Sequence, residues 1–152
     1  MTTYQLAQVN LGRIRYPVDD PRMHGFMSRL DEINAVAEAS DGFVWRLVGE
    51  GNDATSIRPF PDDMLIINMS VWDSAETLHT YTYKSAHAAL FKDRKLWFES
   101  MREAYMVMWW IPAGNTPTVV EAAERLAHLR EHGATPYAFT FRDRFSAEEM
   151  RP

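Results

Sequence analysis

Cysteine is absent from this chain of 152 residues. Without thiols the protein cannot form disulfides, iron–sulfur clusters or thiolate zinc sites, and it cannot use a cysteine nucleophile. Long apolar runs are missing as well, because no segment approaches the roughly 18 apolar residues that span a bilayer. The first residues, Met1 to Pro17, lack the charged and apolar regions of a signal peptide. The sequence therefore predicts a cytoplasmic protein with no membrane partner.

Positive charge is scarce, with 16 Lys and Arg against 21 Asp and Glu and a formal net charge of −5. No basic run is present that would follow a phosphate backbone, so nucleic acid is not an expected partner. The glycine-rich loops that bind nucleotides, GxGxxG and GxxxxGKS/T, are missing, and no serine has the flanking glycines of a nucleophile elbow. These absences argue against nucleotide-binding and serine-hydrolase functions.

A chain of this length is typical of one domain whose core needs no disulfide or metal. We therefore predict a single domain over residues 1–152, with a core at 4–112 and a C-terminal extension at 116–142. Four segments place apolar residues with a period of two, which is typical of strands. These predicted strands lie at 4–11, 43–48, 64–72 and 103–111.

Helix signals separate the predicted strands. Asp20 is an N-cap residue followed by Pro21, and an apolar period of 3.6 continues from there to Ala39. Asp73 and Glu76 form a D-x-x-E capping signal, which predicts that a second helix starts directly after the third strand. The sequence thus predicts one helix after the first strand and another after the third.

The second helix is expected to contain the following aromatic stretch, with a break near Ser85. The extension adds a last helix between Thr118, which begins a capping box with Glu121, and Gly133, and a short edge strand at 137–141. The element order predicts an α+β fold of the ferredoxin-like βαββαβ type, an antiparallel sheet with both helices on one face.

The predicted strands are apolar on both faces, although the helices of such a fold cover only one. A second copy of the chain is the natural cover for the other face, so the sequence predicts a homodimer. The space between the sheet and its helices is then the expected place for a small hydrophobic or aromatic ligand.

The segments LAQVN, DGFVWRL, NMSVWDS, YKSAH, KLWF, WWIPAG and PTVVEAAERLAHLREHGATPYAFTFR together resemble the small bacterial domain of unknown function 3291 family, over residues 4–142. That family is similar in fold to the dimeric α+β barrel proteins, which include antibiotic-biosynthesis monooxygenases and haem-degrading enzymes. The resemblance implies a dimeric α+β barrel. It implies little about the reaction, because one fold can host several chemistries.

His87 is the main candidate for chemistry. Together with Tyr83, Arg94 and Trp97 it recurs at helical spacing, so these side chains are expected to share one side of a helix. An inward-facing imidazole can relay a proton near neutral pH or bind iron. The alternative is a structural histidine that is hydrogen-bonded to a backbone carbonyl or to a tyrosine.

Three amides form a second candidate group. Gln8, Asn10 and Asn68 are polar residues on strand faces that are otherwise apolar, and such groups must be hydrogen-bonded when they are buried. They are suited to orienting a ligand carbonyl or phenol. The alternative is a structural set of amides that ties neighbouring strands together.

Two further groups are weaker candidates. His128 and His132 have a spacing of four residues, which suits metal binding, but no clear third ligand accompanies them, so a solvated helix face is expected. Arg46 and Arg94 are candidates for binding a carboxylate, with surface ion pairing as the alternative. Most of the five tryptophans are expected in the core or in an interface.

Three functional hypotheses follow. The first is a cofactor-independent, monooxygenase-like enzyme acting on a hydrophobic metabolite, with His87 moving the proton and Asn10 with Asn68 holding the oxygen of the substrate anion. The remaining substrate contacts would come from Gln8, Tyr83, Arg94 and Trp97. The second is a haem protein with His87 as axial ligand and, by analogy with haem-degrading proteins of this fold, Asn10 and Trp97 beside the porphyrin. The third is a non-catalytic ligand-binding or interaction module.

Overall fold

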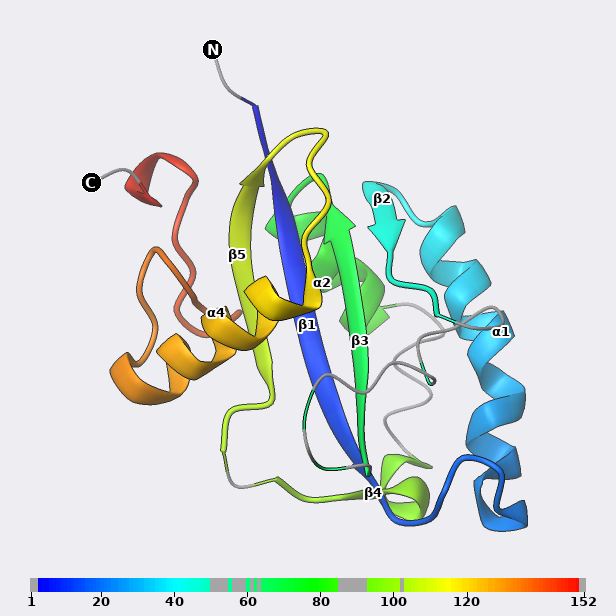
Figure 1. The fold of residues 1–152 in the computed structure, drawn as a ribbon. Helices are drawn as coiled ribbons and strands as arrows, with labels where there is room; N and C mark the ends of the chain where they lie inside the picture. Colours follow the sequence, from blue (N-terminus) through cyan, green and yellow to red (C-terminus); the bar gives the residue numbers. More distant parts are fainter. Residues whose placement is uncertain are drawn as a thin grey trace.

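An antiparallel sheet forms the centre of the molecule (Figure 1). The computed structural model describes residues 3–49, 55, 60, 62, 64–84, 93–101 and 103–150. The strands of the sheet are β1 (Tyr4–Ile14), β2 (Phe43–Arg46), β3 (Leu65–Trp72), β4 (Phe98–Glu99) and β5 (Met106–Pro112). β1 pairs with β3 on one side and with β5 and β4 on the other, while β2 pairs with the far edge of β3. The order β2-β3-β1-β5 confirms the ferredoxin-like arrangement.

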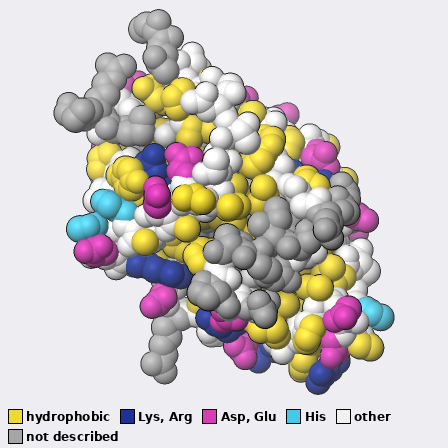
Figure 2. Space-filling model, in the orientation of Figure 1, with side chains coloured by type: hydrophobic (Ala, Val, Ile, Leu, Met, Phe, Trp, Pro, Cys, Tyr) yellow, Lys and Arg dark blue, Asp and Glu magenta, His cyan; other side chains and the backbone are white. Residues whose placement is uncertain are grey.

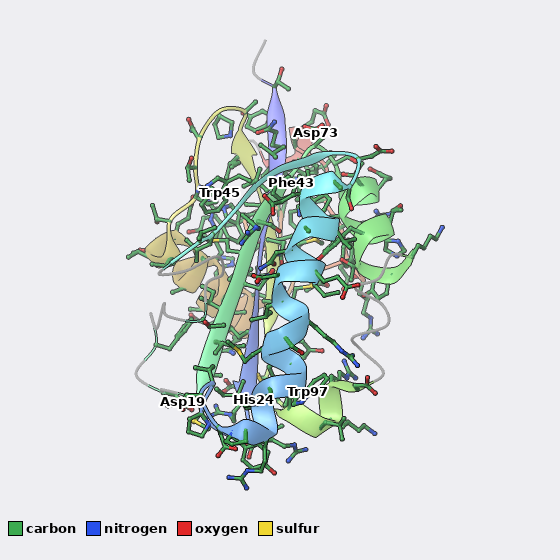
Figure 3. The ribbon with its side chains drawn as sticks, turned by 90° about the vertical axis from the view of Figure 1, so that its right-hand side faces the viewer. Asp19, His24, Phe43, Trp45, Asp73 and Trp97 are labelled. Atoms are coloured by element: carbon green, nitrogen blue, oxygen red, sulfur yellow. The ribbon has the colours of Figure 1, made fainter. Side chains whose placement is uncertain are left out.

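The helices lie on both sides of this sheet. α1 (His24–Ala39) follows a short 3-10 turn at Pro21–Met23, α2 (Ala75–Lys84) follows β3, and α4 (Val119–His132) follows β5. Figure 3 views the sheet near its edge and shows α4 on one side, with α2 on the other and α1 beside it. None of the helices that the structure describes is long and apolar enough to cross a membrane.

The sheet face away from α1 and α2 is buried within a single chain. Val9, Met69 and Val71 on this face are each 1% exposed, and they pack in one cluster with Leu126 and Leu129 of α4. The expectation that this face needs a second copy as its cover is therefore wrong, because the C-terminal helix folds back over it. A homodimer remains a prediction, but the need to cover this sheet face no longer supports it.

The capping residues predicted from the sequence agree with the structure to within one position. Asp20 accepts a hydrogen bond from the backbone N–H of Arg22, as an N-cap does. Thr118 likewise accepts from the backbone N–H of Glu121, and Gly133 ends α4 with a φ of 76°. α2 differs by one position, because its capping pair is Ser74 with Thr77 rather than Asp73 with Glu76.

Several boundaries also differ from the prediction. The strand expected from residue 103 begins at Met106. The short edge strand expected at 137–141 is reduced to two isolated bridges, Met108 with Phe139 and Thr135 with Ala138. Residues 93–97 are helical as predicted. Phe98–Glu99 instead forms β4, which pairs with Arg13 and Ile14. This strand was not predicted, because two residues are too few to show an alternation of apolar and polar side chains. The rest of the predicted second helix segment lies outside the described residues.

The core beneath α1 and α2 is divided into two clusters. The first, here named the Trp72 cluster, contains Leu6, Ala37, Trp72, Ala75, Leu78, Met108 and Phe139. The second, named the Trp97 cluster, contains Ile14, Met23, Phe26, Ile66 and Trp97. Figure 3 places Trp97 near the start of α1 and Phe43, which packs on Trp72, towards the opposite end. On the sheet face towards α1 and α2, the residues of β1 and β3 that lie between the two clusters are polar.

Candidate functional site

Four polar side chains occupy the interval between the two clusters. Gln8 and Asn10 are alternate residues of β1, and Asn68 and Ser70 are alternate residues of β3, so all four share the sheet face towards α1 and α2. In the strand register Gln8 is opposite Ser70 and Asn10 is opposite Asn68. We name these four residues the amide strip.

Hydrogen bonds join the amide strip into one network. Gln8 Nε2 donates to Ser70 Oγ at 2.8 Å and to Asn68 Oδ1 at 3.1 Å. Asn10 Nδ2 donates to Gln8 Oε1 at 3.0 Å and to Asn68 Oδ1 at 3.3 Å. Trp72 Nε1 donates to Ser70 Oγ at 2.8 Å, which connects the network to the Trp72 cluster. The strip therefore ties β1 to β3, as the structural alternative predicted.

The strip is nevertheless open at one end. Gln8 and Ser70 are buried, at 3% and 7% exposed, whereas Asn10 is half-buried and Asn68 is exposed. The described pairing of β2 with β3 ends at Ser70, so Asn68 lies just past the end of β2, at a part of the face that is open to solvent.

Asn34 of α1 adds a polar group that the sequence analysis missed. It is 7% exposed and lies on the buried helix face with Phe26, Ile33 and Ala37. It comes four residues after Leu30, which packs on the Trp97 cluster, and three before Ala37 of the Trp72 cluster. Asn34 therefore lies at the level of the amide strip. The sequence signal that could have identified Asn34 is its position, because it places an amide on the apolar side of the helical repeat.

The side-chain amide of Asn34 has no hydrogen-bond partner among the residues that the structure describes. Its amide atoms are not among the unpaired side-chain atoms that are fully cut off from solvent, so they keep some contact with water. An amide in this position can donate to or accept from a molecule that binds beside the strip.

α2 and β2 contribute two large polar side chains beside the strip. Tyr81 stacks on Trp72 at 5.0 Å between ring centroids, and its hydroxyl donates to the Ile33 carbonyl at 3.4 Å. Burial raises the pKa of Tyr81 far above its usual range, so this phenol stays neutral and cannot serve as a base near pH 7. Arg46 is opposite Ser70 in the register and pairs with Glu38 at 3.4 Å. Its side chain is only 9% exposed, which differs from the expected surface pair.

The structure separates the other predicted site residues. Trp97 is 5% exposed and packs on Phe26, and a Cβ at Gly25 would lie only 2.9 Å from its ring. Tyr83 is 52% exposed and contacts His79 and Phe141 at ring-centroid distances of 4.7 and 5.8 Å. The prediction that Tyr83 and Trp97 share one helix side is therefore wrong.

The remaining predictions in this region concern Arg94 and His87. Arg94 is exposed, and His87 lies outside the described residues. The haem hypothesis rests on His87 and stays a prediction. Trp97, which this hypothesis places beside the porphyrin, is 5% exposed and packs in the Trp97 cluster.

The α4 side of the molecule contains two shallow hollows. One is formed around Pro112 and Pro117, and the other around His128 and Tyr137. Figure 2 shows this side, where histidine and acidic side chains neighbour one another. The rings of His128 and His132 are 4.5 Å apart, but the described residues contain no group of three or more His, Asp or Glu that could hold a metal ion. Neither hollow includes a residue of the amide strip.

Comparison with known proteins identifies the family. The model of the family described as Domain of unknown function (DUF3291) matches residues 5–152. The chain belongs to this family. The resemblance seen in the sequence is thereby confirmed. No curated protein matches the chain.

Three solved structures are similar to this DUF3291 member. SnoaB, a cofactor-independent oxygenase from Streptomyces nogalater, is 14% identical, with 74% of this chain and 95% of SnoaB covered and a TM-score of 0.48. NE2512 of unknown function from Nitrosomonas europaea is 9% identical, with 78% and 97% covered and a TM-score of 0.48. PA3566 from Pseudomonas aeruginosa is 8% identical, with 76% and 99% covered and a TM-score of 0.49. Similarity at this level says nothing about the reaction.

In this DUF3291 member the chemistry must therefore be argued from the side chains. The amide strip offers hydrogen-bonding groups at the sheet, Asn34 offers an amide from α1, and apolar clusters lie on both sides. Small-molecule sites commonly combine apolar walls with a few oriented polar groups.

Proposed function

We propose that the protein is an enzyme that binds a small hydrophobic or aromatic molecule over the amide strip, between the Trp72 and Trp97 clusters. The observation that supports this proposal is the exposed Asn68, which hydrogen bonds from Gln8 and Asn10 hold in place where β3 pairs with β1. The network fixes the amides before a ligand arrives, so little side-chain entropy is lost on binding. The apolar clusters provide the hydrophobic contact area.

The proposed reaction is a cofactor-independent oxygenation. A base removes a proton from a substrate carbon next to a carbonyl, and the resulting carbanion gives its electrons to O₂. For a methylene carbon, one oxygen atom becomes a new carbonyl and the other leaves as water. An amide N–H of the strip donates to the carbonyl oxygen of the neutral substrate and so polarises it, and His87 takes the proton in this proposal.

The test begins with the molecule that the freshly purified protein retains, identified by native mass spectrometry. Oxygen uptake with that molecule is then measured for the wild type and for His87→Ala. Loss of a general base lowers kcat/KM by roughly 10²- to 10⁴-fold. His132→Ala, which removes an exposed histidine of α4, is the matched control and should keep full activity. Turnover that His87→Ala leaves unchanged would contradict the proposed mechanism.

A further inference from the structure

The hydrogen bonds of the amide strip leave a defined pair of groups for a ligand. A side-chain amide has two N–H donors and one carbonyl oxygen with two acceptor positions. Both donors of Gln8 and both donors of Asn10 are used inside the network, and Asn68 Oδ1 accepts twice. Asn10 Oδ1 and Asn68 Nδ2 have no partner among the described residues. At the exposed end of the strip, an acceptor oxygen and a donor N–H₂ group therefore remain side by side.

Reversing all three amides together gives the same result. Asn68 then donates to Gln8 and Asn10, Gln8 donates to Asn10, and the Ser70 hydroxyl donates to Gln8. Ser70 still accepts from Trp72 in this arrangement, because an indole N–H can only donate. The groups left over at the exposed end are now the Asn10 N–H₂ and the Asn68 carbonyl, while one N–H of Gln8 inside the network has no acceptor. Either orientation of the network presents one donor beside one acceptor.

Asn10 and Asn68 are direct partners in the β1–β3 register, so the donor and the acceptor lie side by side. An oxyanion needs donors only, and it would be repelled by the neighbouring carbonyl oxygen. A neutral group with an N–H or O–H next to a carbonyl satisfies both positions. This differs from the role predicted for the two asparagines, in which both donate to a substrate anion.

We infer that the amide strip recognises a neutral donor–acceptor edge, as found in a lactam or carboxamide, rather than an oxyanion. The inference rests on the proposed function and names the class of ligand that this site selects. The donor of the strip polarises the ligand carbonyl, and the acceptor holds the adjacent N–H. Asn34, at the same level on α1, supplies a further amide close to the ligand.

Three bicyclic probes of similar size test the inference on the full chain by isothermal titration calorimetry. 2-Quinolone has the lactam edge, N-methyl-2-quinolone lacks the donor, and 2-naphthoate is an anion. We expect 2-quinolone to bind about tenfold more tightly than either of the others, because each of them leaves a polar group of the strip unpaired. Equal binding of the N-methyl compound, tighter binding of 2-naphthoate, or no binding of 2-quinolone would overturn the inference.

Asn68→Asp provides a second measurement on the strip itself. A carboxylate can only accept, so the variant holds the network in one orientation and presents two acceptors to the ligand. We expect its affinity for 2-quinolone to fall about tenfold and its preference to move to protonated 2-aminoquinoline, which has two donors. Asn115→Asp makes the same chemical change at an exposed turn and should leave the preference for 2-quinolone unchanged. Thermal melting confirms that both variants are folded.

The outcomes separate this inference from the proposed function. If 2-quinolone is preferred but no oxygen uptake depends on His87, the ligand class stands and the oxygenase proposal fails. If oxygen uptake depends on His87 but Asn68→Asp does not change the order of the probes, the oxygenase proposal stands and the inferred ligand class is wrong.

Discussion

Asn34 and Gln8 show two opposite ways in which a buried amide can exist in this core. Gln8 is 3% exposed and uses both its N–H groups and its carbonyl in hydrogen bonds. Asn34 is 7% exposed and has no side-chain partner in the described part of the chain. The first amide ties the strands together, whereas the second leaves its hydrogen-bonding groups available. An available amide on a helix beside the strip is expected at a site where a ligand completes the hydrogen bonds.

Replacing Asn34 with leucine should therefore stabilise the protein and weaken ligand binding. Leucine adds apolar contact between the two core clusters and is the better helix former, so we expect the free energy of unfolding to rise by about 1 kcal/mol. Urea denaturation measures this change, and calorimetry with 2-quinolone measures the loss of affinity. Ile33→Leu, one residue earlier at a site 8% exposed, is the control and should change neither quantity strongly. A destabilised Asn34→Leu that binds normally would contradict the assignment.

At the scale of elements, a charged cap begins the 3-10 turn at Pro21–Met23 that leads into α1. The Asp20 carboxylate accepts hydrogen bonds from the side chain and the backbone N–H of Arg22, which lowers the pKa of Asp20 from 3.8 to about 2. Because the folded-state pKa is depressed, the stabilisation is complete above the unfolded pKa and is lost as the pH falls through about 2. Asp20 is half-buried and Arg22 is exposed, so the contribution of the pair is small and salt-dependent.

Asp20→Asn tests this electrostatic contribution. Asparagine is as good an N-cap as aspartate but does not ionise in this range. The wild type should lose more stability than the variant between pH 4 and pH 2, and urea denaturation at several pH values in 0.1 M salt measures the difference. Asp41→Asn, a change at an exposed residue after α1, is the control and should retain the wild-type slope. Identical slopes in wild type and Asp20→Asn would show that the cap has no charge-dependent role.

Local signals located the caps better than the sides of the helices. Thr118 was predicted correctly because a threonine followed three residues later by glutamate has few competing positions. Ser74 was missed because it stands next to Asp73, and both residues are good N-caps. The pairing of Tyr83 with Trp97 failed because it assumed one continuous helical side, whereas Tyr83 packs on Phe141 and Trp97 packs under α1. Such placement depends on packing between distant segments, which residue spacing does not encode.

At the scale of the whole molecule, α4 makes the sheet a buried layer. Leu126 is 1% exposed and belongs to the cluster that covers Val9, Met69 and Val71. The strand alternation predicted that both faces need a cover, and this prediction was sound. The sequence did not reveal which segment provides the cover, because an amphipathic C-terminal helix and a second copy satisfy the same pattern. The amide strip was visible in the alternation, but its opening at Asn68 depends on where β2 ends.

Leu126→Ala measures the contribution of this cover. Truncating a fully buried leucine in a packed core lowers the free energy of unfolding by roughly 2–5 kcal/mol. Val120→Ala, at a site of α4 that is 65% exposed, is the matched control and should change stability by less than about 0.5 kcal/mol. Chemical denaturation of both variants measures the two changes in the free energy of unfolding. Equal, small effects would mean that α4 does not close the sheet in solution.

The central claim is that the open end of the amide strip binds a ligand, and side-chain amide NMR tests it most directly. In a ¹H–¹⁵N spectrum of the full chain, titration with 2-quinolone should shift the side-chain N–H₂ signals of Asn10, Asn34 and Asn68 together. The N–H₂ signal of Asn115, at an exposed turn near α4, should not move. Shifts confined to residues around His128 and Tyr137, with the three asparagines unchanged, would contradict the account.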